Sequence, residues 1–385
     1  MRYLLLNSLK AGGAERVAQI LASTGIFDEI ILLEDEIDYK VSIPTKKLSY
    51  HTSQTSSVYK TLFLPIYARR LNRMIKGKDV VVSFTERANF VNIISSWSTG
   101  HLPIISVHTN IKSEFKRPTK YLYYLLIKWL YPKAAAIVSV SKGIKGVIDE
   151  AIGKWKNINT VIYNPVILSD FRPASLEDRK IIVNVGRLSS PKGQWNLLRI
   201  FKKVLEKEPD AKLYIAGDGE MRDFLINCSQ ELGLKTFWGK PEEAQFKTNE
   251  VFFLGYQENV SRLYHLASIL VMTSILEGLP MAILEAMACG LPVISSDCPY
   301  GPSEILKKDG RSFGVLMPSA GGEKNNFAKE QENDQIWADK ILELLSNKEM
   351  SATLSKKALE RASDFSLEKT KDEWISLFSQ LEQGR

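Results

Sequence analysis

Two glutamates eight positions apart, Glu277 and Glu285, lie in an otherwise mostly apolar stretch, EGLPMAILEAMACGLPVISSD (277–297). The preceding segment SILVMTS (268–274) is typical of a buried strand, Pro280 suits the first position of a helix, and Gly290 suits its end. A helix over about 281–289 would place its free N–H groups and its positive dipole end where the strand finishes. This arrangement predicts an anion site, most naturally for a phosphate.

The two carboxylates beside this site, Glu277 and Glu285, would repel a phosphate. We therefore expect them to accept hydrogen bonds from sugar hydroxyls next to it. For each glutamate taken alone the structural alternative is simpler: Glu277 would cap the helix and Glu285 would face solvent. The whole unit of strand, Glu-Gly-Leu-Pro and helix favours the binding interpretation.

A second loop carries cations in NVGRLSSPKGQW (184–195), where a strand ends at Gly186 and a helix follows. Arg187 offers a planar fork of donors and Lys192 a mobile point charge, and both complement phosphate oxygens. Five residues apart on a strand-to-helix loop, the two side chains predict a diphosphate site.

The first strand of the chain is followed by LKAGGAER (9–16), where Gly12 and Gly13 let the backbone approach a ligand. Neither this loop nor AGDGEMRD, which contains Gly217, supplies the G-x-G-x-x-G of a dinucleotide site, so NAD binding is disfavoured. Among the four histidines, His108 ends a strand in PIISVHTN and is the best placed for catalysis.

The order of elements predicts an α/β protein with two doubly wound parallel sheets, because buried strand-like runs alternate with helical patterns. The segment 163–173 has two prolines and no period and is the expected linker, while 236–249 and 318–334 are expected as polar surface excursions. A helix starting at Ser366 should close the chain. The expected strands are 2–7, 29–33, 79–84, 103–108, 136–141, 180–186, 212–219, 250–255, 268–274 and 292–297.

Composition excludes several classes. The chain has 385 residues, 44% of them hydrophobic, and three cysteines without CxxC spacing, which disfavours a disulfide framework or zinc site and favours a reducing cytoplasm. The most apolar long stretch, 121–140, is broken by lysines and a proline, so we expect no membrane span. The formal net charge is +7, and residues 40–145 hold 18 Lys and Arg against 3 Asp and Glu.

That basic segment interleaves cations with aromatic and aliphatic residues in 58–78 and 115–133. Such helices can lie in the headgroup layer of an anionic membrane, although their apolar faces could equally be core. The expected acceptor-binding or membrane-facing cations are Arg69, Arg70, Arg73, Lys116, Arg117 and Lys120.

The motifs GGAER, SVHTN, GRLSSPKG, AGDGEMR, FLGYQENV and EGLPMAILEAMACGLPVISSD, in this order, resemble family 4 of the retaining glycosyltransferases. The resemblance covers nearly the whole chain and implies the GT-B fold, with two Rossmann-like domains facing a cleft. It implies an acceptor-binding domain at 1–165, a nucleotide-sugar domain at 166–365, and a last helix, 366–385, that crosses back to the first domain. It assigns no role to TERANF (85–90).

The resemblance implies that Arg187 and Lys192 hold the donor diphosphate and that Glu285 takes the ribose hydroxyls. Glu277 and the backbone after it would hold the donor sugar and phosphate, with His108 beside the sugar. His108, Arg187, Lys192 and Glu277 are the expected catalytic residues, and the expected donor-binding set is Gly12, Gly13, Gly186, Arg187, Lys192, Gly217, Glu277, Gly278, Leu279, Pro280, Met281 and Glu285.

The implied reaction is front-face transfer with retention, without a metal or a separate cofactor: the acceptor hydroxyl attacks on the side that the diphosphate leaves. The similarity is greatest to members that build surface glycans and lipid-linked oligosaccharides, including N-acetylgalactosaminyltransferases. A UDP-sugar donor, a polyprenyl-diphosphate-linked glycan acceptor and peripheral attachment to the cytoplasmic face of the membrane are therefore expected. No nucleic-acid partner is expected.

Three alternatives stay open. A nucleotide-sugar epimerase shares the architecture but would need acid and base groups that the expected cleft is short of. A non-catalytic sugar-nucleotide binding protein would not need Arg187, Lys192 and both glutamates intact. A nucleic-acid binder would account for the basic charge, which the membrane hypothesis also explains.

Overall fold

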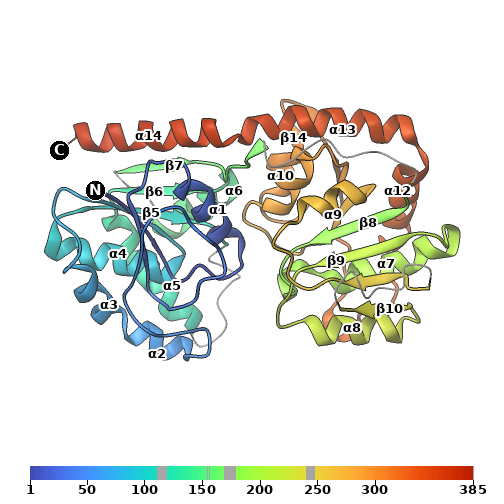
Figure 1. Cartoon of the computed structure of the whole chain (residues 1–385), viewed down its shortest axis with the longest axis horizontal. Coiled ribbons are helices and arrows are strands. Elements are labelled where there is room, and N and C mark those ends of the chain that lie inside the picture. The colour runs from blue at the N-terminus through green and yellow to red at the C-terminus, as the bar shows by residue number, and fades with distance from the viewer. Residues whose placement is uncertain (111–118, 154, 156, 169–178, 240–247, 385) are drawn as a thin grey trace. The chain divides into compact units, whose positions relative to one another are not determined.

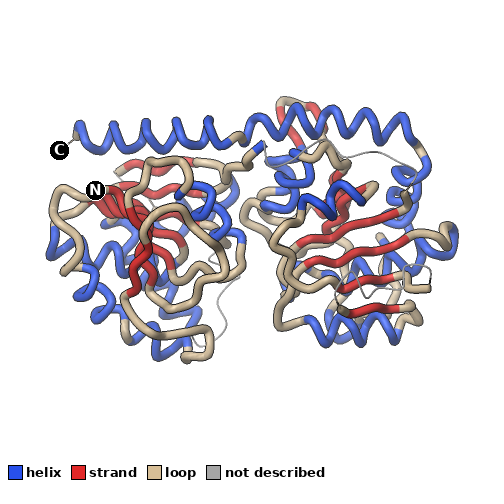
Figure 2. The backbone as a smooth tube through the Cα atoms, in the orientation of Figure 1, coloured by secondary structure: helices blue, strands red, loops and turns tan. Residues whose placement is uncertain are grey.

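The computed structural model describes residues 1–384 apart from 111–118, 154, 156, 169–178 and 240–247, and apart from the side chains of 119 and 120. The chain forms two compact units (Figure 1). Unit 1 comprises Met1–Pro165 and Ser366–Arg385, and unit 2 comprises Val166–Phe365. Each unit is a parallel sheet with helices between its strands, which confirms the predicted fold class (Figure 2).

Unit 1 contains a seven-stranded sheet in the order β3-β2-β1-β4-β5-β6-β7, in which all neighbours are parallel. Its central strands are almost completely buried, as the unbroken apolar runs require of strands covered on both faces. The chain leaves β1 toward β2 and β3 and returns to β4 on the other side, so the direction of winding changes between β1 and β4. The strands are β1 (Arg2–Leu6), β2 (Glu29–Leu32), β3 (Thr45–Lys47), β4 (Val80–Phe84), β5 (Leu102–Val107), β6 (Ala136–Ser139) and β7 (Ile158–Val161).

The helices of unit 1 include the end of the chain. Helix α14 begins at the N-cap Ser366, whose hydroxyl accepts a hydrogen bond from the Lys369 amide. Its Trp374 and Phe378 rings pack edge-on against Phe27 at 6.4 and 5.8 Å between centroids. The helices are α1 (Gly13–Ala22), α2 (Ser57–Leu62), α3 (Leu64–Leu71), α4 (Glu86–Thr99), α5 (Thr119–Leu130), α6 (Lys142–Ile152) and α14 (Leu367–Gln383).

Unit 2 repeats the architecture with the order β10-β11-β9-β8-β12-β13-β16, again parallel throughout. Here the direction of winding changes between β8 and β12. The strands are β8 (Ile181–Val185), β9 (Lys212–Ala216), β10 (Thr236–Trp238), β11 (Val251–Phe253), β12 (Ile269–Met272), β13 (Val293–Ser296) and β16 (Val315–Met317), with a small hairpin of β14 (Lys307–Lys308) and β15 (Arg311–Ser312).

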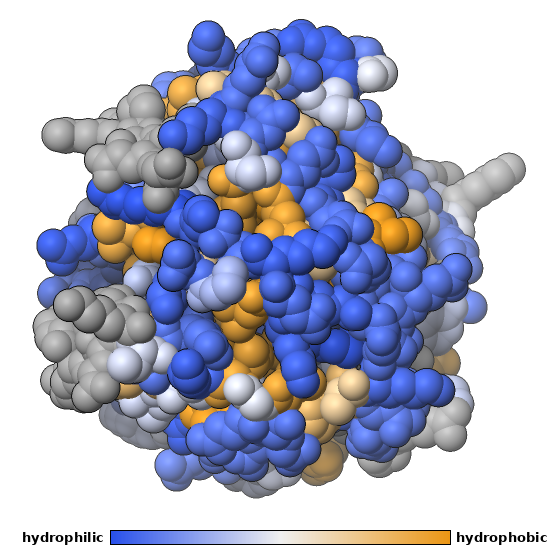
Figure 3. Space-filling view, turned by 90° about the vertical axis from the view of Figure 1, so that its right-hand side faces the viewer, coloured by the Kyte–Doolittle hydropathy of each residue, from blue (hydrophilic) through white to orange (hydrophobic). Residues whose placement is uncertain are grey.

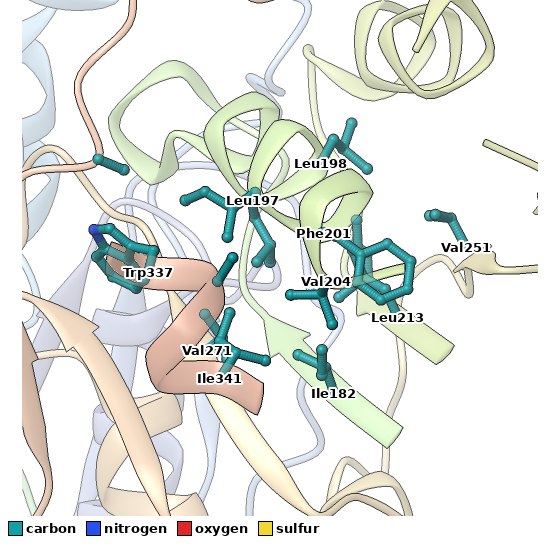
Figure 4. Packing of buried hydrophobic residues seen from close by; sticks show 14 of the residues in the cluster. Ile182, Leu197, Leu198, Phe201, Val204, Leu213, Val251, Val271, Trp337 and Ile341 are labelled. Carbon is teal, nitrogen blue, oxygen red and sulfur yellow. The ribbon is translucent and has the colours of Figure 1, made fainter. Parts of the chain in front are cut away.

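The core of unit 2 forms where α7 and α12 pack on the sheet (Figure 4). Leu197 of α7 lies toward Trp337 and Ile341 of α12, whereas Phe201 of α7 lies beside Leu213 of β9, and all five are buried. The outer face seen in Figure 3 is mostly hydrophilic, with hydrophobic residues in separated patches. The helices are α7 (Gln194–Lys207), α8 (Arg222–Glu231), α9 (Ser261–Leu266), α10 (Met281–Ala288), α11 (Pro302–Leu306), α12 (Asp334–Ser346) and α13 (Lys348–Ala362).

Four strands that the sequence did not suggest are the outer strands of the two sheets: β3, β7, β10 and β16. An edge strand has a neighbour on one side only and less buried surface, so its apolar pattern is short or absent. The prediction of a surface excursion over 236–249 is wrong at its start, since residues 236–238 form β10. Residues 240–247 of that segment lie outside the described residues.

The prediction of a surface excursion over 318–334 agrees with the exposure of most of its residues, but its backbone is fastened to the core through Arg199. The guanidinium forms an ion pair with Asp334, with Nε–Oδ2 at 2.7 Å and Nη2–Oδ1 at 2.9 Å. It also donates to the carbonyls of Ala320 and Phe327 at 3.0 Å. Both charged side chains are buried, and a polar stretch can bury its backbone only when such donors satisfy its carbonyls.

Candidate active site

The predicted site residues of unit 2 follow the two strands between which the winding of its sheet changes. Arg187 and Lys192 lie in the loop after β8, and Glu277 lies in the loop after β12, which is the neighbour of β8 in the sheet. Ligands of doubly wound sheets bind beyond the carboxyl ends of the strands at this point. The tertiary structure thus brings the two loops together at the place where a ligand is expected.

The centre of the site is a contact between Lys192 and Glu277. The lysine Nζ lies 2.7 Å from both carboxylate oxygens of Glu277. Ser274 donates its hydroxyl to Oε1 of the same carboxylate, also at 2.7 Å. The glutamate and serine are buried, and the lysine side chain is 23% exposed. Glu277 is therefore held in one orientation by two donors, and its negative charge is balanced.

The two loops are also interlocked through their backbones at Gly193. This residue has φ +60°, and a Cβ there would lie 2.6 Å from the Thr273 carbonyl oxygen. Thr273 in turn donates its hydroxyl to the Gly193 carbonyl at 3.0 Å. Only glycine fits this approach, which sets the position of the neighbouring Lys192 relative to β12.

The predicted helix after Glu277 is α10, and it begins one residue after Pro280, which is its extended N-cap. Within the described residues, no side chain caps this end, so amide N–H groups of the first turn open at the carboxyl edge of the sheet. Glu285 is buried on the helix, where its Oε2 lies 3.4 Å from the hydroxyl of Tyr264. The structural alternative for Glu285, a side chain in solvent, is wrong.

The backbone of Glu277 is fixed by the loop after β13. Its N–H donates to the Pro299 carbonyl and its carbonyl accepts from the Tyr300 N–H, both at 2.9 Å. Gly301, with φ +94°, packs against the predicted donor-binding Gly278 so closely that a Cβ would lie 2.6 Å from the Gly278 oxygen. Gly278, Leu279, Pro280 and Met281 are thereby held as a rigid entry to α10.

Arg187 has a different environment from Lys192. Its side chain is 67% exposed and its contact is with the exposed Glu220, at 3.5 Å. An exposed pair of this kind contributes little to stability, so the guanidinium can turn to a ligand at small cost. The turn that carries it depends on Gly217, where a Cβ would lie 2.0 Å from the Gly186 oxygen. Gly186 and Gly217 thus let the loops after β8 and β9 touch.

Three further predicted residues, Gly12, Gly13 and His108, belong to unit 1. Gly12 is the extended N-cap of α1, and Gly13 is its first residue. His108 directly follows β5, is buried against the Phe84 ring, and has its Nε2 3.0 Å from the hydroxyl of Ser106. Burial lowers the pKa of His108 from 6.5 to about 3, so its imidazole is neutral at physiological pH.

Of the predicted basic surface, Arg69, Arg70 and Arg73 are exposed on and just after α3. Arg70 donates to the Leu48 carbonyl and lies over the Phe63 ring. Lys116 and Arg117 lie outside the described residues, as does the side chain of Lys120.

Sequence reasoning missed Ser274 and Thr273, which hold Glu277 and Gly193. The spacing S-x-x-E in SILE (274–277) is that of a capping box, in which a serine and a glutamate lie close together, and it could have pointed to Ser274. The cysteines of the site region offer no nucleophile. Cys289 and Cys298 are buried, which raises the pKa of each thiol to about 12. In the part of the chain that the structure describes, no three His, Cys, Asp or Glu side chains are grouped to hold a metal ion.

Known families match both units. Residues 168–361 match the family "Glycosyl transferases group 1", and residues 41–170 match "Glycosyltransferase Family 4". An uncharacterised glycosyltransferase of Methanocaldococcus jannaschii is 29% identical over 77% of this chain and 78% of its own. A Campylobacter jejuni α-1,4-N-acetyl-D-galactosaminyltransferase, named for a GalNAc-GalNAc-diNAcBac-PP-undecaprenol acceptor, is 26% identical over 99% of this chain and 98% of its own.

Solved structures share the fold. Anabaena HepE in complex with UDP-glucose superposes with a TM-score of 0.76 at 19% identity, covering 99% of this chain and 100% of that one. Sucrose-phosphate synthase from Thermosynechococcus elongatus superposes with a TM-score of 0.77 at 17% identity, with 100% of both chains covered.

Proposed function

This chain belongs to glycosyltransferase family 4, whose members are retaining enzymes, and we propose that it moves a hexose or N-acetylhexosamine from a UDP-linked sugar to a lipid-linked oligosaccharide or glycan acceptor. The product would serve the synthesis of a surface polysaccharide or of a glycoprotein glycan. The observation that carries this proposal is the Lys192–Glu277 contact beside the uncapped first turn of α10. It brings a cation, a carboxylate and the first amides of a helix to one ligand-binding edge of the sheet.

Lys192 can serve the diphosphate and Glu277 together. An ammonium group has three N–H donors, and the two oxygens of Glu277 account for two of them. The third is left for a phosphate oxygen of the donor. Because Lys192 already balances the glutamate, Glu277 can stay beside a diphosphate without repelling it, and its remaining acceptor capacity suits hydroxyls of the donor sugar.

The leaving group takes up negative charge as the sugar departs, and fixed cations stabilise that charge in the transition state. Lys192 provides a half-buried cation, Arg187 an exposed one, and the first turn of α10 the amides. The acceptor hydroxyl attacks from the face that the diphosphate leaves, and a donor phosphate oxygen takes its proton. Glu285, one turn along α10, is assigned to the ribose hydroxyls.

Unit 1 is assigned to the acceptor. The names of two Campylobacter jejuni relatives specify diphospho-undecaprenol-linked glycans, which supports a lipid-linked acceptor for this chain. His108 and the loop of Gly12 and Gly13 are proposed to lie beside the donor sugar. With a pKa of about 3, His108 acts there as a neutral hydrogen-bonding group and not as a cation.

We further propose that unit 1 binds the surface of an anionic membrane. No described helix is long and apolar enough to cross a bilayer, so attachment would be peripheral. Trp97 and Trp129 are 53% and 60% exposed, with their rings 5.5 Å apart, and large aromatic groups of this kind favour the headgroup layer. Other exposed apolar residues lie on α5 and on α2 and α3: Tyr121, Leu122, Tyr124 and Leu125 on the first, and Val58, Tyr59, Leu62 and Ile66 on the other two.

The test is a panel of nucleotide sugars incubated with the protein, with and without prenyl-diphosphate-linked sugar acceptors. We expect one UDP-sugar to release UDP faster when an acceptor is present, with an α-linked product identified by NMR. Lys192→Met is the inactive control. A donor sugar that returns with an inverted ring hydroxyl would identify an epimerase instead, and a donor that is bound without any turnover would identify a non-catalytic binding protein.

A further inference from the structure

The motif TERANF, to which the resemblance assigns no role, lies at the carboxyl edge of the unit 1 sheet. Thr85 directly follows β4, and Asn7 directly follows β1, its neighbour. The winding of this sheet changes between these two strands, so this is the edge of unit 1 where a ligand is expected. Nothing assigned so far to unit 1 uses these side chains.

Three polar atoms just after β1 and β4 are buried without a hydrogen-bond partner within the described part of the chain. They are Oδ1 of Asn7, Oγ1 of Thr85 and Nη1 of Arg87. Folded proteins satisfy almost all buried polar atoms, so three such atoms on two neighbouring loops call for an explanation. The residues themselves are half-buried, and a side-chain rotation can therefore present each atom to a ligand.

The backbone of Thr85 is strained. Its φ and ψ are 71° and 156°, a region that glycine occupies and that a β-branched residue almost never adopts. Glycine would fit the turn between β4 and α4 without strain, so the retained threonine points to a use for its side chain. Strained residues of this kind are concentrated where proteins bind or transform ligands.

In the part of the chain that the structure describes, the guanidinium of Arg87 is paired through Nη2, while Nη1 has no partner. Nη2 is in contact with Glu34, which follows β2, and the other oxygen of Glu34 lies 2.9 Å from the Nζ of Lys60. Since β1 lies between β4 and β2 in the sheet, Arg87 reaches across the carboxyl end of β1. Lys60 is fixed in turn by the Thr52 carbonyl at 3.1 Å. The ion pair thus engages Nη2 of the planar guanidinium and leaves Nη1 for a ligand.

The charges and donors of the cluster indicate which ligand fits. The buried or half-buried cations Lys60 and Arg87 are balanced by Glu34 and by Glu86, which accepts from the Thr109 hydroxyl at 3.2 Å. A site for a diphosphate would show an excess of positive charge. Instead, the unpaired atoms are a carbonyl acceptor, a hydroxyl and a donor, and such a mixed set is complementary to the hydroxyls of a neutral sugar.

We propose that Asn7, Thr85 and Arg87 form the subsite of unit 1 that binds the accepting sugar of the acceptor. The identity of this sugar as part of the acceptor rests on the proposed function, but the binding of a sugar is a property of unit 1 by itself. Hydroxyl groups of the sugar satisfy the three unpaired atoms. The strain at Thr85 is maintained because the hydroxyl must be presented at this point of the turn.

Direct binding tests the subsite. The probe is benzyl α-N-acetylgalactosaminide, titrated with the full chain and followed by saturation-transfer NMR. Thr85→Val removes the hydroxyl and keeps the branched shape, and Arg87→Lys keeps the ion pair with Glu34 and removes the second nitrogen. Each should weaken probe binding by about tenfold or more, the effect of losing one hydrogen bond to a buried or charged group. In turnover, the same variants should raise the acceptor KM and leave the donor KM unchanged.

The chain offers a matched control in Thr45→Val. Among the described residues, the Thr45 hydroxyl is also buried without a hydrogen-bond partner, but Thr45 is the first residue of β3 and lies at the opposite edge of the sheet. This variant should bind the probe as the wild type does. Thr85→Gly is the control for misfolding, because it removes the backbone strain together with the hydroxyl. It should unfold at no lower temperature than the wild type and yet bind the probe more weakly than the wild type does.

The outcomes separate the subsite from the proposed function. If the wild type does not bind the probe, or if Thr85→Val and Arg87→Lys bind it as well as Thr45→Val does, the subsite is refuted whatever the enzyme transfers. If no nucleotide sugar is turned over while the variants lose the probe, the proposed function fails and the sugar site stands.

Discussion

The contact between Lys192 and Glu277 gives the sharpest prediction, because it makes stability and catalysis respond differently to related substitutions. Lys192→Met keeps the aliphatic stem and removes the charge, which leaves a buried carboxylate with Ser274 as its remaining side-chain partner among the described residues. Breaking a fully buried pair costs about 3–5 kcal/mol. Lys192 is 23% exposed, so solvent screens part of the loss, and we expect unit 2 to lose about 2–3 kcal/mol.

The rate of transfer should fall by at least a hundredfold in this variant, since one fixed charge on a developing oxyanion is worth about 3 kcal/mol. Adding Glu277→Gln to Lys192→Met removes the uncompensated charge and should restore about 1–2 kcal/mol of the free energy of unfolding. Transfer should stay low in the double variant, because neither the phosphate-binding cation nor the carboxylate is present.

Arg187→Ala is the matched comparison. Its guanidinium is exposed and contacts only an exposed glutamate among the described residues, so the free energy of unfolding should change by less than about 0.5 kcal/mol. The rate should nevertheless fall by about a hundredfold if Arg187 turns to the diphosphate.

Urea unfolding and initial rates of UDP release measure the two quantities on the same samples. Near-normal turnover in both Lys192→Met and Arg187→Ala would refute the assignment of these cations to the donor. A double variant that is no more stable than Lys192→Met would refute the idea that the lysine compensates a buried charge at Glu277.

Three further outcomes are expected. Transfer should survive excess EDTA, because Lys192, Arg187 and the first turn of α10 already balance the diphosphate; loss of activity restored by Mg²⁺ or Mn²⁺ would contradict this. The free energy of unfolding of unit 1 should fall by up to about 1.4 kcal/mol per pH unit as the pH drops from about 6.5 toward 3. The reason is that His108 in the unfolded chain takes up a proton that the buried neutral ring does not. In urea titrations at several pH values, His108→Gln should flatten this slope. The protein should sediment with anionic vesicles at low salt and be released by high salt. As a control, replacing the exposed unit 2 residues Lys207 and Lys235 with neutral residues should leave this sedimentation unchanged. A wild type that does not sediment with such vesicles would favour a soluble acceptor. Binding should be lost, with donor hydrolysis intact, when serine replaces Arg69, Arg70, Arg73, Lys116, Arg117 and Lys120.

The inner strands of both sheets could be predicted from the sequence, because a strand covered on both faces must be apolar along its whole length. VVVSF in β4 and ILVM in β12 are such runs. The helix caps were equally local: Ser366 starts α14, and the Gly-Leu-Pro after Glu277 starts α10. Each of these signals is contained in a few consecutive residues.

The sequence by itself thus determined two wound sheets, the loops that carry Arg187, Lys192 and Glu277, and the helix end between the glutamates. Only the tertiary structure decided which of these groups pair. Lys192 and Glu277 are 85 positions apart and meet because β8 and β12 are neighbours in the sheet, and Arg87 meets Glu34 because both strand ends flank β1. The strained turn at Thr85 is likewise absent from any local pattern. Burial and turns are encoded by a few consecutive residues. Ion pairs and unpaired polar atoms depend instead on the order of the strands in the sheet, which is determined jointly by distant parts of the chain.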